Sequence, residues 1–261
     1  MITLRELKAV LKIWKLAWAE ALVDRRAVLI QVLALGGNGV VWLVFWFFFF
    51  RRVGVIRSWG FNELVTLLVI AWSIHGVVIG GLSNVRRLGE LISTGRIDAT
   101  LALPGPTLPF LLVRKIDALQ AGNFVVGLGV YIFIGQPSLV KTVLVSGAII
   151  AGSVVLTSLL IVAGSLSFYT RHDAASDLGF HAVSLFMAYP ADIFGRGTRF
   201  MMYAVVPAAF VTTVPARMIF EFSRTLALVV LVSAVVAPAI ATKVFYRGLE
   251  RYTSGAVWTT A

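Results

Sequence analysis

The sequence predicts an all-α integral membrane protein, built as a single transmembrane domain over residues 1–261. Composition is the first reason: 59% of the residues are hydrophobic and only 13% are charged, whereas soluble domains carry about 25% charged residues. Mean hydropathy is +0.92. The second reason is a series of long runs without charge, several of them near the ~20 residues that a helix needs to cross the hydrocarbon core.

The first predicted element, residues 1–26, is an amphipathic helix lying in the membrane–water interface. Its apolar residues recur every three or four positions and its basic residues lie on the opposite side: Leu4, Leu7, Leu11, Trp14 and Trp18 against Arg5, Lys8, Lys12 and Lys15. A soluble helix packed on another domain would show the same pattern and stays open as an alternative. Charges continue to Arg26 before a clean apolar run begins, which is not the pattern of a cleavable signal peptide.

Apolar runs then mark the expected spans: 27–50, 64–85, 118–140, 142–170, a shorter run at 178–191, and 225–242. Residues 200–216 are either a seventh span or a re-entrant pair of short helices. Pro207 and Pro215 slightly favour the re-entrant alternative, because proline removes a backbone donor and kinks a helix. The residues alone therefore predict six or seven spans.

Basic residues orient these spans. With six or with seven spans, most of the 23 Lys and Arg residues fall on the cytoplasmic side if the N-terminus lies there, as the positive-inside rule requires. Both alternatives place the loop 86–115 in the cytoplasm. The formal net charge of +11 is accordingly explained by contact with anionic lipid headgroups, and no nucleic-acid partner is expected.

Within this loop, a short helix is expected near residues 88–94. Leu88, Leu91 and Ile92 share one helical face, Gly95 can end the helix in a left-handed cap, and Asp98 can begin the next turn. Such a helix could dock its apolar face into a groove on a soluble partner, with a polar rim formed by Glu90, Arg96 and Asp98. From spacing alone, a helix that lies on lipid and touches nothing is an equal alternative.

Catalytic and cofactor-binding patterns are absent from the sequence. There is no cysteine, and the nearest approach to a P-loop, residues 135–142, has Val140 where the second glycine belongs. His75 and His181 lie within expected spans, where one hydrogen bond to a neighbouring helix is the commoner fate of a histidine. Neither forms a metal-ligand spacing. We expect no catalytic, cofactor or metal site and no ATP hydrolysis by this chain.

Residues 51–248 resemble the ABC-2-like permease family once listed as a domain of unknown function, whose members pair with a separate ATPase. One match is a Tyr-Pro-x-Asp-x-Phe turn followed by Pro-Ala segments: Tyr189, Pro190, Asp192 and Phe194, then Pro207 and Pro215. The other match is the loop Leu88, Glu90, Leu91, Ile92, Gly95, Asp98, Leu101 and Pro104. Gly195 departs from the family, which often has proline there.

The resemblance implies six spans, with the interfacial N-terminal helix, a cytoplasmic coupling helix between spans two and three in the 86–107 loop, and an outer re-entrant helical hairpin at 190–222 before span six. The tail 243–261 and the N-terminus would both be cytoplasmic, in the cell membrane. Two ATPase subunits would carry ATP and Mg and bind the coupling loop, and a second permease chain, the same or homologous, would complete the pathway. The implied ATPase contacts are Leu88, Glu90, Leu91, Ile92, Arg96 and Asp98.

From the features that the resemblance implies, we expect the chain to be the permease subunit of an ATP-driven exporter. Two other classes stay open: a secondary transporter driven by an ion gradient, which needs paired acidic groups at mid-membrane, and a membrane scaffold or sensor that transports nothing. The prospective pathway faces are apolar with scattered Ser, Thr and Gly. They are compatible with lipids, hydrophobic peptides or amphipathic drugs as cargo.

Overall fold

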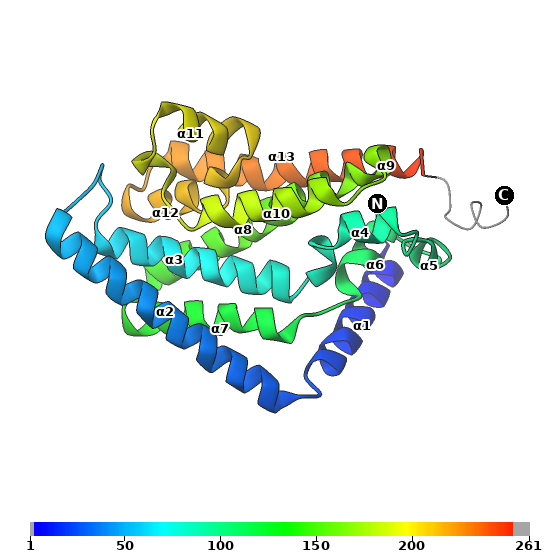
Figure 1. Ribbon diagram of the computed structural model, residues 1–261, viewed down its shortest axis with the longest axis horizontal. Coiled ribbons are helices and arrows are strands. Elements are labelled where there is room, and N and C mark those ends of the chain that lie inside the picture. Colours follow the sequence, from blue (N-terminus) through cyan, green and yellow to red (C-terminus); the bar gives the residue numbers. More distant parts are fainter. Residues whose placement is uncertain (1–2, 253–261) are drawn as a thin grey trace.

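The computed structural model describes residues 3–252, and this part of the chain is helical without a β-strand. Helices α3, α7, α8, α10 and α13 run along the long axis of the molecule, and α2 crosses them obliquely on one side (Figure 1). The bounds of the six are α2 Arg25–Val53, α3 Phe61–His75, α7 Ala118–Phe133, α8 Leu139–Ser165, α10 Ala174–Met187 and α13 Arg224–Leu249.

The number of spans is only partly settled by these helices. Within residues 3–252, four segments are long and apolar enough to cross a membrane: Arg25–Val53, Phe61–Gly80, Leu139–Thr170 and Arg224–Leu249. A fifth arises if α6 (Thr107–Val113) and α7, bent by 78° to one another, count as one span. The predicted fifth span, α10, has 14 residues, or about 21 Å of helix. The all-helical multi-pass architecture is confirmed, and six spans stay a prediction.

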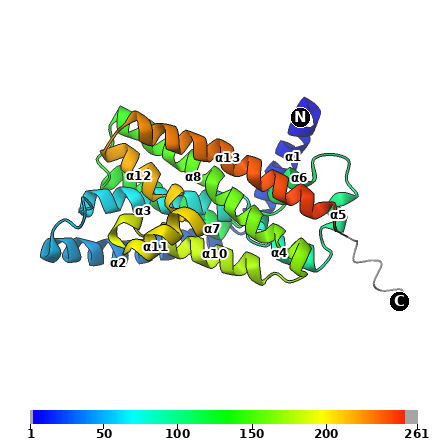
Figure 2. The ribbon, with the colours of Figure 1, turned by 90° about the horizontal axis from the view of Figure 1, so that it is seen from above.

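Helix α3 forms the centre of the bundle. The most apolar 18 residues of Phe61–Gly80, the segment that contains α3, are 78% buried. The corresponding stretches of α2 and α13 are each 11% buried. Helices α7 and α8 pack on α3, and α13 packs along α8 on the far side (Figure 2). The outward faces of α2 and α13 expose large apolar side chains such as Phe48 and Val235. Long apolar faces of this kind require lipid or another apolar surface as their environment.

The bundle is tight because small residues let helices approach closely. Helix α3 continues into a π-helical turn, η1 (Gly76–Gly80), and a Cβ at Gly76 would collide with the backbone of Phe124 in α7. A π-turn inserts an extra residue into the helical ladder and so changes the direction of the next residues. The chain can then turn through η2 (Ser83–Val85) into the loop that carries the predicted coupling helix.

The predicted N-terminal helix is present as α1 (Leu4–Ala21). It begins with a capping box, in which Thr3 and Glu6 satisfy each other's backbone donors. Its apolar stripe is largely uncovered by the chain, with Leu4 79%, Leu7 47% and Leu11 47% exposed. This exposure is what a helix lying in a lipid interface requires. The first two residues of the predicted 1–26 element lie outside the described residues.

The segment 200–216 is not a continuous helix, so the alternative of a seventh span is not supported. It consists of short pieces that break at Val206 and Pro207: α11 (Arg196–Phe200), η4 (Met201–Val205), η5 (Ala208–Phe210) and α12 (Thr213–Phe220). Pro207 lacks the backbone donor that a continuous helix would need. At the other terminus, α13 extends to Leu249, beyond the predicted start of the tail at 243. Residues 253–261 of that tail lie outside the described part.

The glycine pair of α7 offers a matched test of this packing. A Cβ at Gly127 would lie 2.5 Å from Ser73 Oγ and 3.1 Å from the backbone of α3, whereas nothing lies within 4 Å of a Cβ at Gly129. We expect Gly127→Val to cost about 1–3 kcal/mol through overpacking and to lower the midpoint of thermal denaturation of the detergent-purified protein by several degrees. Gly129→Val should leave the midpoint unchanged; equal effects would contradict the α3–α7 packing.

Candidate functional site

The residues singled out by the sequence gather at opposite ends of the bundle. One end, called here the loop end, carries α4 (Leu88–Ser93), α5 (Asp98–Leu101) and α6. The other, the hairpin end, carries α11 and α12 (Figure 1). As predicted, Gly95 ends the first loop helix with a positive φ of 73°, and the next helix begins at Asp98.

The predicted apolar anchors of the loop end face the chain's own interior. Leu88 is 0% and Ile92 3% exposed, and both belong to the main hydrophobic core. Helix α4 packs on α8 and α10, where a Cβ on Gly164 would lie 2.8 Å from Leu88 Cβ. In this structure the two residues anchor the loop to its own bundle and are not presented to a partner, which differs from the docking geometry expected from the sequence.

The exposed part of the loop end lies further along the chain. Leu101 is 37% and Leu103 42% exposed, and Arg96 and Ala99 are exposed beside them. Leu91 is only half-buried. Leu101 and Leu103 were not among the predicted contact residues. The sequence signal that could have indicated them is a pair of leucines just before Pro104 in a loop.

Glu90 is held in a charged cluster on this surface. Arg87 donates two hydrogen bonds to its carboxylate, at 2.9 and 2.8 Å, and Arg96 Nη1 lies 3.3 Å from Glu90 Oε1. The hydrogen bonds from Arg87 lower the pKa of Glu90. A lowered folded-state pKa means that this contribution to stability is present at neutral pH and is lost as pH falls through that pKa.

The last described residue ties the loop end to α13. Tyr252 Oη donates a hydrogen bond of 2.8 Å to Asp98 Oδ1. The ring of Phe168, in α9 (Ser167–Thr170), lies edge-on to the rings of Phe245 and Tyr252, with centroids 5.6 and 5.9 Å away. The predicted contact residue Asp98 is therefore held by Tyr252, just beyond the end of α13, a link across 154 positions that the sequence does not signal.

At the hairpin end, the Tyr-Pro-x-Asp-x-Phe turn packs against α2. The Tyr189 ring lies 6.3 Å from that of Trp46 and 6.3 Å from that of Phe194. Pro190 precedes the short helix η3 (Ala191–Ile193). Pro215 is buried within α12. The structure brings the predicted residues of the turn into one region.

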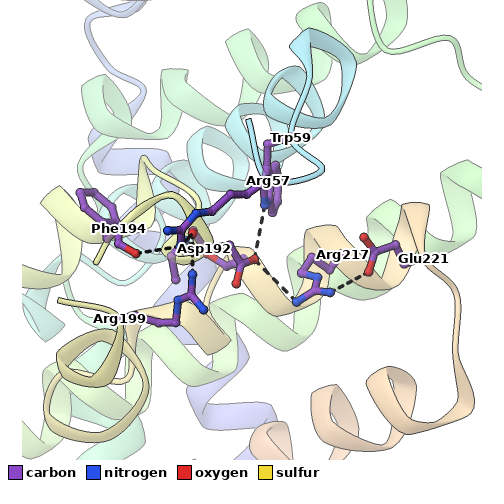
Figure 3. Close-up of polar contacts among 9 residues, drawn as sticks. Arg57, Trp59, Asp192, Phe194, Arg199, Arg217 and Glu221 are labelled. Atoms are coloured by element: carbon purple, nitrogen blue, oxygen red, sulfur yellow. Dashed lines mark hydrogen bonds and ion pairs between the residues drawn. The ribbon is translucent and has the colours of Figure 1, made fainter. Parts of the chain in front are cut away.

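Asp192 is the centre of this region (Figure 3). Its carboxylate accepts a hydrogen bond from Trp59 Nε1 at 3.3 Å and lies 3.7 Å from Arg217 Nη1. Its backbone carbonyl accepts from Arg57 at 3.0 Å and from Arg199 at 2.7 Å. One residue thereby joins the α2–α3 connection, α11 and α12.

Sequence reasoning missed Arg57 and Trp59. They lie in a tight turn in which Arg57 and Ser58 have φ of 48° and 71° and Ile56 pairs with Trp59. Non-glycine residues in left-handed backbone are uncommon and persist where surrounding contacts hold them. Here the two side chains provide those contacts, reaching residues more than 130 positions away.

The two histidines expected within spans make simple polar contacts. His75 Nε2 lies 3.3 Å from Gln120 Oε1, the single neighbouring-helix contact expected for it. His181 Nδ1 lies 2.8 Å from the backbone carbonyl oxygen of Asp177, one turn earlier on its own helix. The His75 contact joins α3 to α7 and the His181 contact stays within α10, and among residues 3–252 neither is part of a longer chain of ionisable groups.

Removing the Tyr252 hydroxyl should loosen α5. We expect Tyr252→Phe, which keeps the ring, to lose about 0.5–1.5 kcal/mol and to speed amide hydrogen exchange in residues 98–101. Tyr246→Phe, in α13 shortly before Tyr252, is the control, because its side chain has no hydrogen bond among residues 3–252. Unchanged exchange at 98–101 in Tyr252→Phe would show that the hydroxyl does not restrain the loop.

Removing the Asp192 carboxylate should loosen the hairpin end. Asp192 has 16% of its side chain exposed, whereas Glu221, the other partner of Arg217, has 47%. Partly buried pairs contribute more than solvated ones. We therefore expect Asp192→Ala to speed amide exchange across 190–222 by several-fold, and Glu221→Ala to have little effect. The reverse order would contradict the central role of Asp192.

Comparison with known proteins places this architecture in a family. No curated protein and no solved structure matches the chain significantly. A family model described as an ABC-2 family transporter protein matches residues 37–256. This range contains every long helix from the middle of α2 onward, the loop end and the hairpin end, and it confirms the resemblance drawn from the sequence motifs. The chain therefore belongs to the ABC-2 family of transporter membrane proteins.

Proposed function

We propose that the chain is the permease subunit of an ATP-driven ABC exporter and forms half of a translocation pathway. The observation that carries this proposal is the family match over residues 37–256, supported by the uncovered apolar faces of α2 and α13. ATP and Mg would belong to a separate ATPase dimer, and the second half of the pathway to another permease chain, the same or homologous. The loop end, both termini and α1 would face the cytoplasm.

The loop end is the proposed docking surface for the ATPase. Its exposed tip combines Leu101 and Leu103 with Arg96, an apolar centre with a charged neighbour, which is the composition that protein interfaces favour. Glu90, Leu91 and Asp98 flank it. The buried residues Leu88 and Ile92 would serve this contact indirectly, by fixing α4 to α8 and α10.

Packing explains how closure of the ATPase dimer would reach the pathway. Helix α4 rests on α8 and α10, and α5 is tied to α13 through Tyr252. A displacement of the loop end would thus be passed to three long helices together. The energy would come from the different affinity of the ATPase for the two states of the permease.

The hairpin end would lie on the outer side, where the Asp192 cluster holds the short helices α11 and α12 against the α2–α3 turn. This assignment gives six spans, with α10 as the short fifth span. A secondary transporter would need paired acidic groups within the spans. In each of the four long apolar segments, the most apolar 18 residues contain at most two charged residues. The ATP-driven alternative is therefore favoured.

The docking surface is tested by replacing its exposed leucines. We expect the double variant Leu101→Asp with Leu103→Asp to abolish co-purification of a P-loop ATPase, identified by mass spectrometry, while the variant still elutes as a folded protein. Leu139→Asp is the matched control: the residue is 84% exposed and lies at the first turn of α8, where an acidic side chain suits the helix dipole. Normal ATPase association in the double variant would exclude this surface.

A further inference from the structure

A cavity of about 690 Å³ lies at the loop end, between the beginnings of α7 and α10. Its walls come from five parts of the chain: the end of α1, η1 with η2, α4, the α6–α7 connection and the first turn of α10. The volume lies within the range of about 300–1,000 Å³ typical of small-molecule sites. Because α1 closes one side and long apolar helices begin at the others, the cavity lies where the apolar bundle meets water.

The charged groups of this cavity fall into two sets. Among the cations that line the cavity, Arg86 and Lys115 form no ion pair within residues 3–252. Among the lining carboxylates, Asp173 forms none within these residues either. Asp177 lies beside Asp173 and reaches only His181, at 3.5 Å, with 65% of its side chain exposed.

The other charged lining residues already have partners. Arg87 and Glu90 bind each other, and Asp117 caps α7 by accepting from two backbone donors.

The cations Arg86 and Lys115 and the acids Asp173 and Asp177 belong to different elements. The cations belong to the α3–α4 and α6–α7 connections, which are joined by hydrogen bonds from Ser83 to the Lys115 carbonyl. The acids belong to the first turn of α10. Arg86 is also fixed, since its guanidinium lies 4.3 Å from the centre of the Phe180 ring. A ligand with one charge would be attracted by the cations and repelled by the acids, or the reverse, whereas a ligand with both charges satisfies both.

The cavity also has an apolar side. Ile79, Ile116, Ala118 and Leu119 line it, and Leu119 is 40% exposed. Val77 is the one large apolar residue of Phe61–Gly80 with more than a third of its surface exposed, at 37%. It lies in η1, the same short helix as the lining residue Ile79.

We propose that this cavity binds the zwitterionic headgroup of an amphiphile, with its anionic group at Lys115 and Arg86, its cationic group at Asp173 and Asp177, and its apolar chain beside Leu119 and Val77. Lysine and arginine form strong charge-assisted hydrogen bonds with phosphate and carboxylate, and carboxylates do so with an ammonium group. A phospholipid of the inner leaflet and an amphiphilic cargo present the same chemistry. The proposal rests on the proposed function only for the placement of the loop end at the inner leaflet.

The test uses the purified full chain in detergent and native mass spectrometry with three lipids of equal chain length: zwitterionic phosphatidylethanolamine, anionic phosphatidylglycerol and a cationic ethylphosphatidylcholine. We expect phosphatidylethanolamine to bind about tenfold more tightly than either other lipid, which corresponds to one charge-assisted contact of about 1.4 kcal/mol. Equal binding of all three lipids, or preference for a singly charged one, would overturn the proposal.

The variants give a sharper readout than loss of binding. Lys115→Ala should move the preference towards the cationic lipid, and Asp173→Ala should move it towards phosphatidylglycerol. Arg196→Ala and Glu250→Ala, exposed charges away from the cavity, should keep the preference of the unaltered chain. A merely structural role of Lys115 or Asp173 would weaken all three lipids equally, and that outcome would also overturn the proposal.

A second arm separates the two sources of the headgroup. The chain is reconstituted with its co-purified ATPase in vesicles containing a fluorescent short-chain phosphatidylethanolamine, and movement between leaflets is followed. ATP-dependent movement that Lys115→Ala abolishes identifies cargo; tight binding without movement identifies a resident lipid. Both results support the headgroup site. If no ATPase co-purifies, the proposed function fails, while the lipid-binding measurement on the chain alone still decides this proposal.

Discussion

The burial of α3 among α7, α8 and their neighbours is the constraint on which the rest of the structure depends. A membrane offers little hydrophobic driving force between helices, so close packing has to hold them together. Small residues such as Gly76 and Gly127 bring the backbones of α3 and α7 into contact. With α3 fixed, the two connections at its ends, the Arg57 turn and the loop end, acquire defined positions.

The loop end is held in place by its contacts with this core. Leu88 and Ile92 are inserted between α8 and α10, and Tyr252 holds α5 from the side of α13. A surface anchored at several points moves only if long helices move with it. A mobile loop on the same sequence could bind a partner equally well, but it could not transmit the displacement that the proposed function requires.

The sequence predicted the helical membrane architecture, the N-terminal helix α1, the stop at Gly95 and the restart at Asp98, because these depend on composition and on residues close together in the chain. It did not predict that Leu88 and Ile92 face inward. A hydrophobic face of a short helix has the same periodicity whether its own bundle or a partner covers it. Arg57, Trp59 and Tyr252 were missed for a related reason: their partners Asp192 and Asp98 lie more than 130 positions away.

The two polar ends of the bundle differ in how their charges are satisfied, and this difference bears on what each can do. At the hairpin end, Arg57, Arg199 and Arg217 all reach Asp192, so the charges hold protein segments to one another. At the loop end, Lys115 and Asp173 face a cavity without an ion pair among the described residues. Charges that already bind each other stabilise a fold. Charges on different elements that form no ion pair with each other can be satisfied by a ligand that bridges them, which is why the loop end, and not the hairpin end, is where an amphiphile would be recognised.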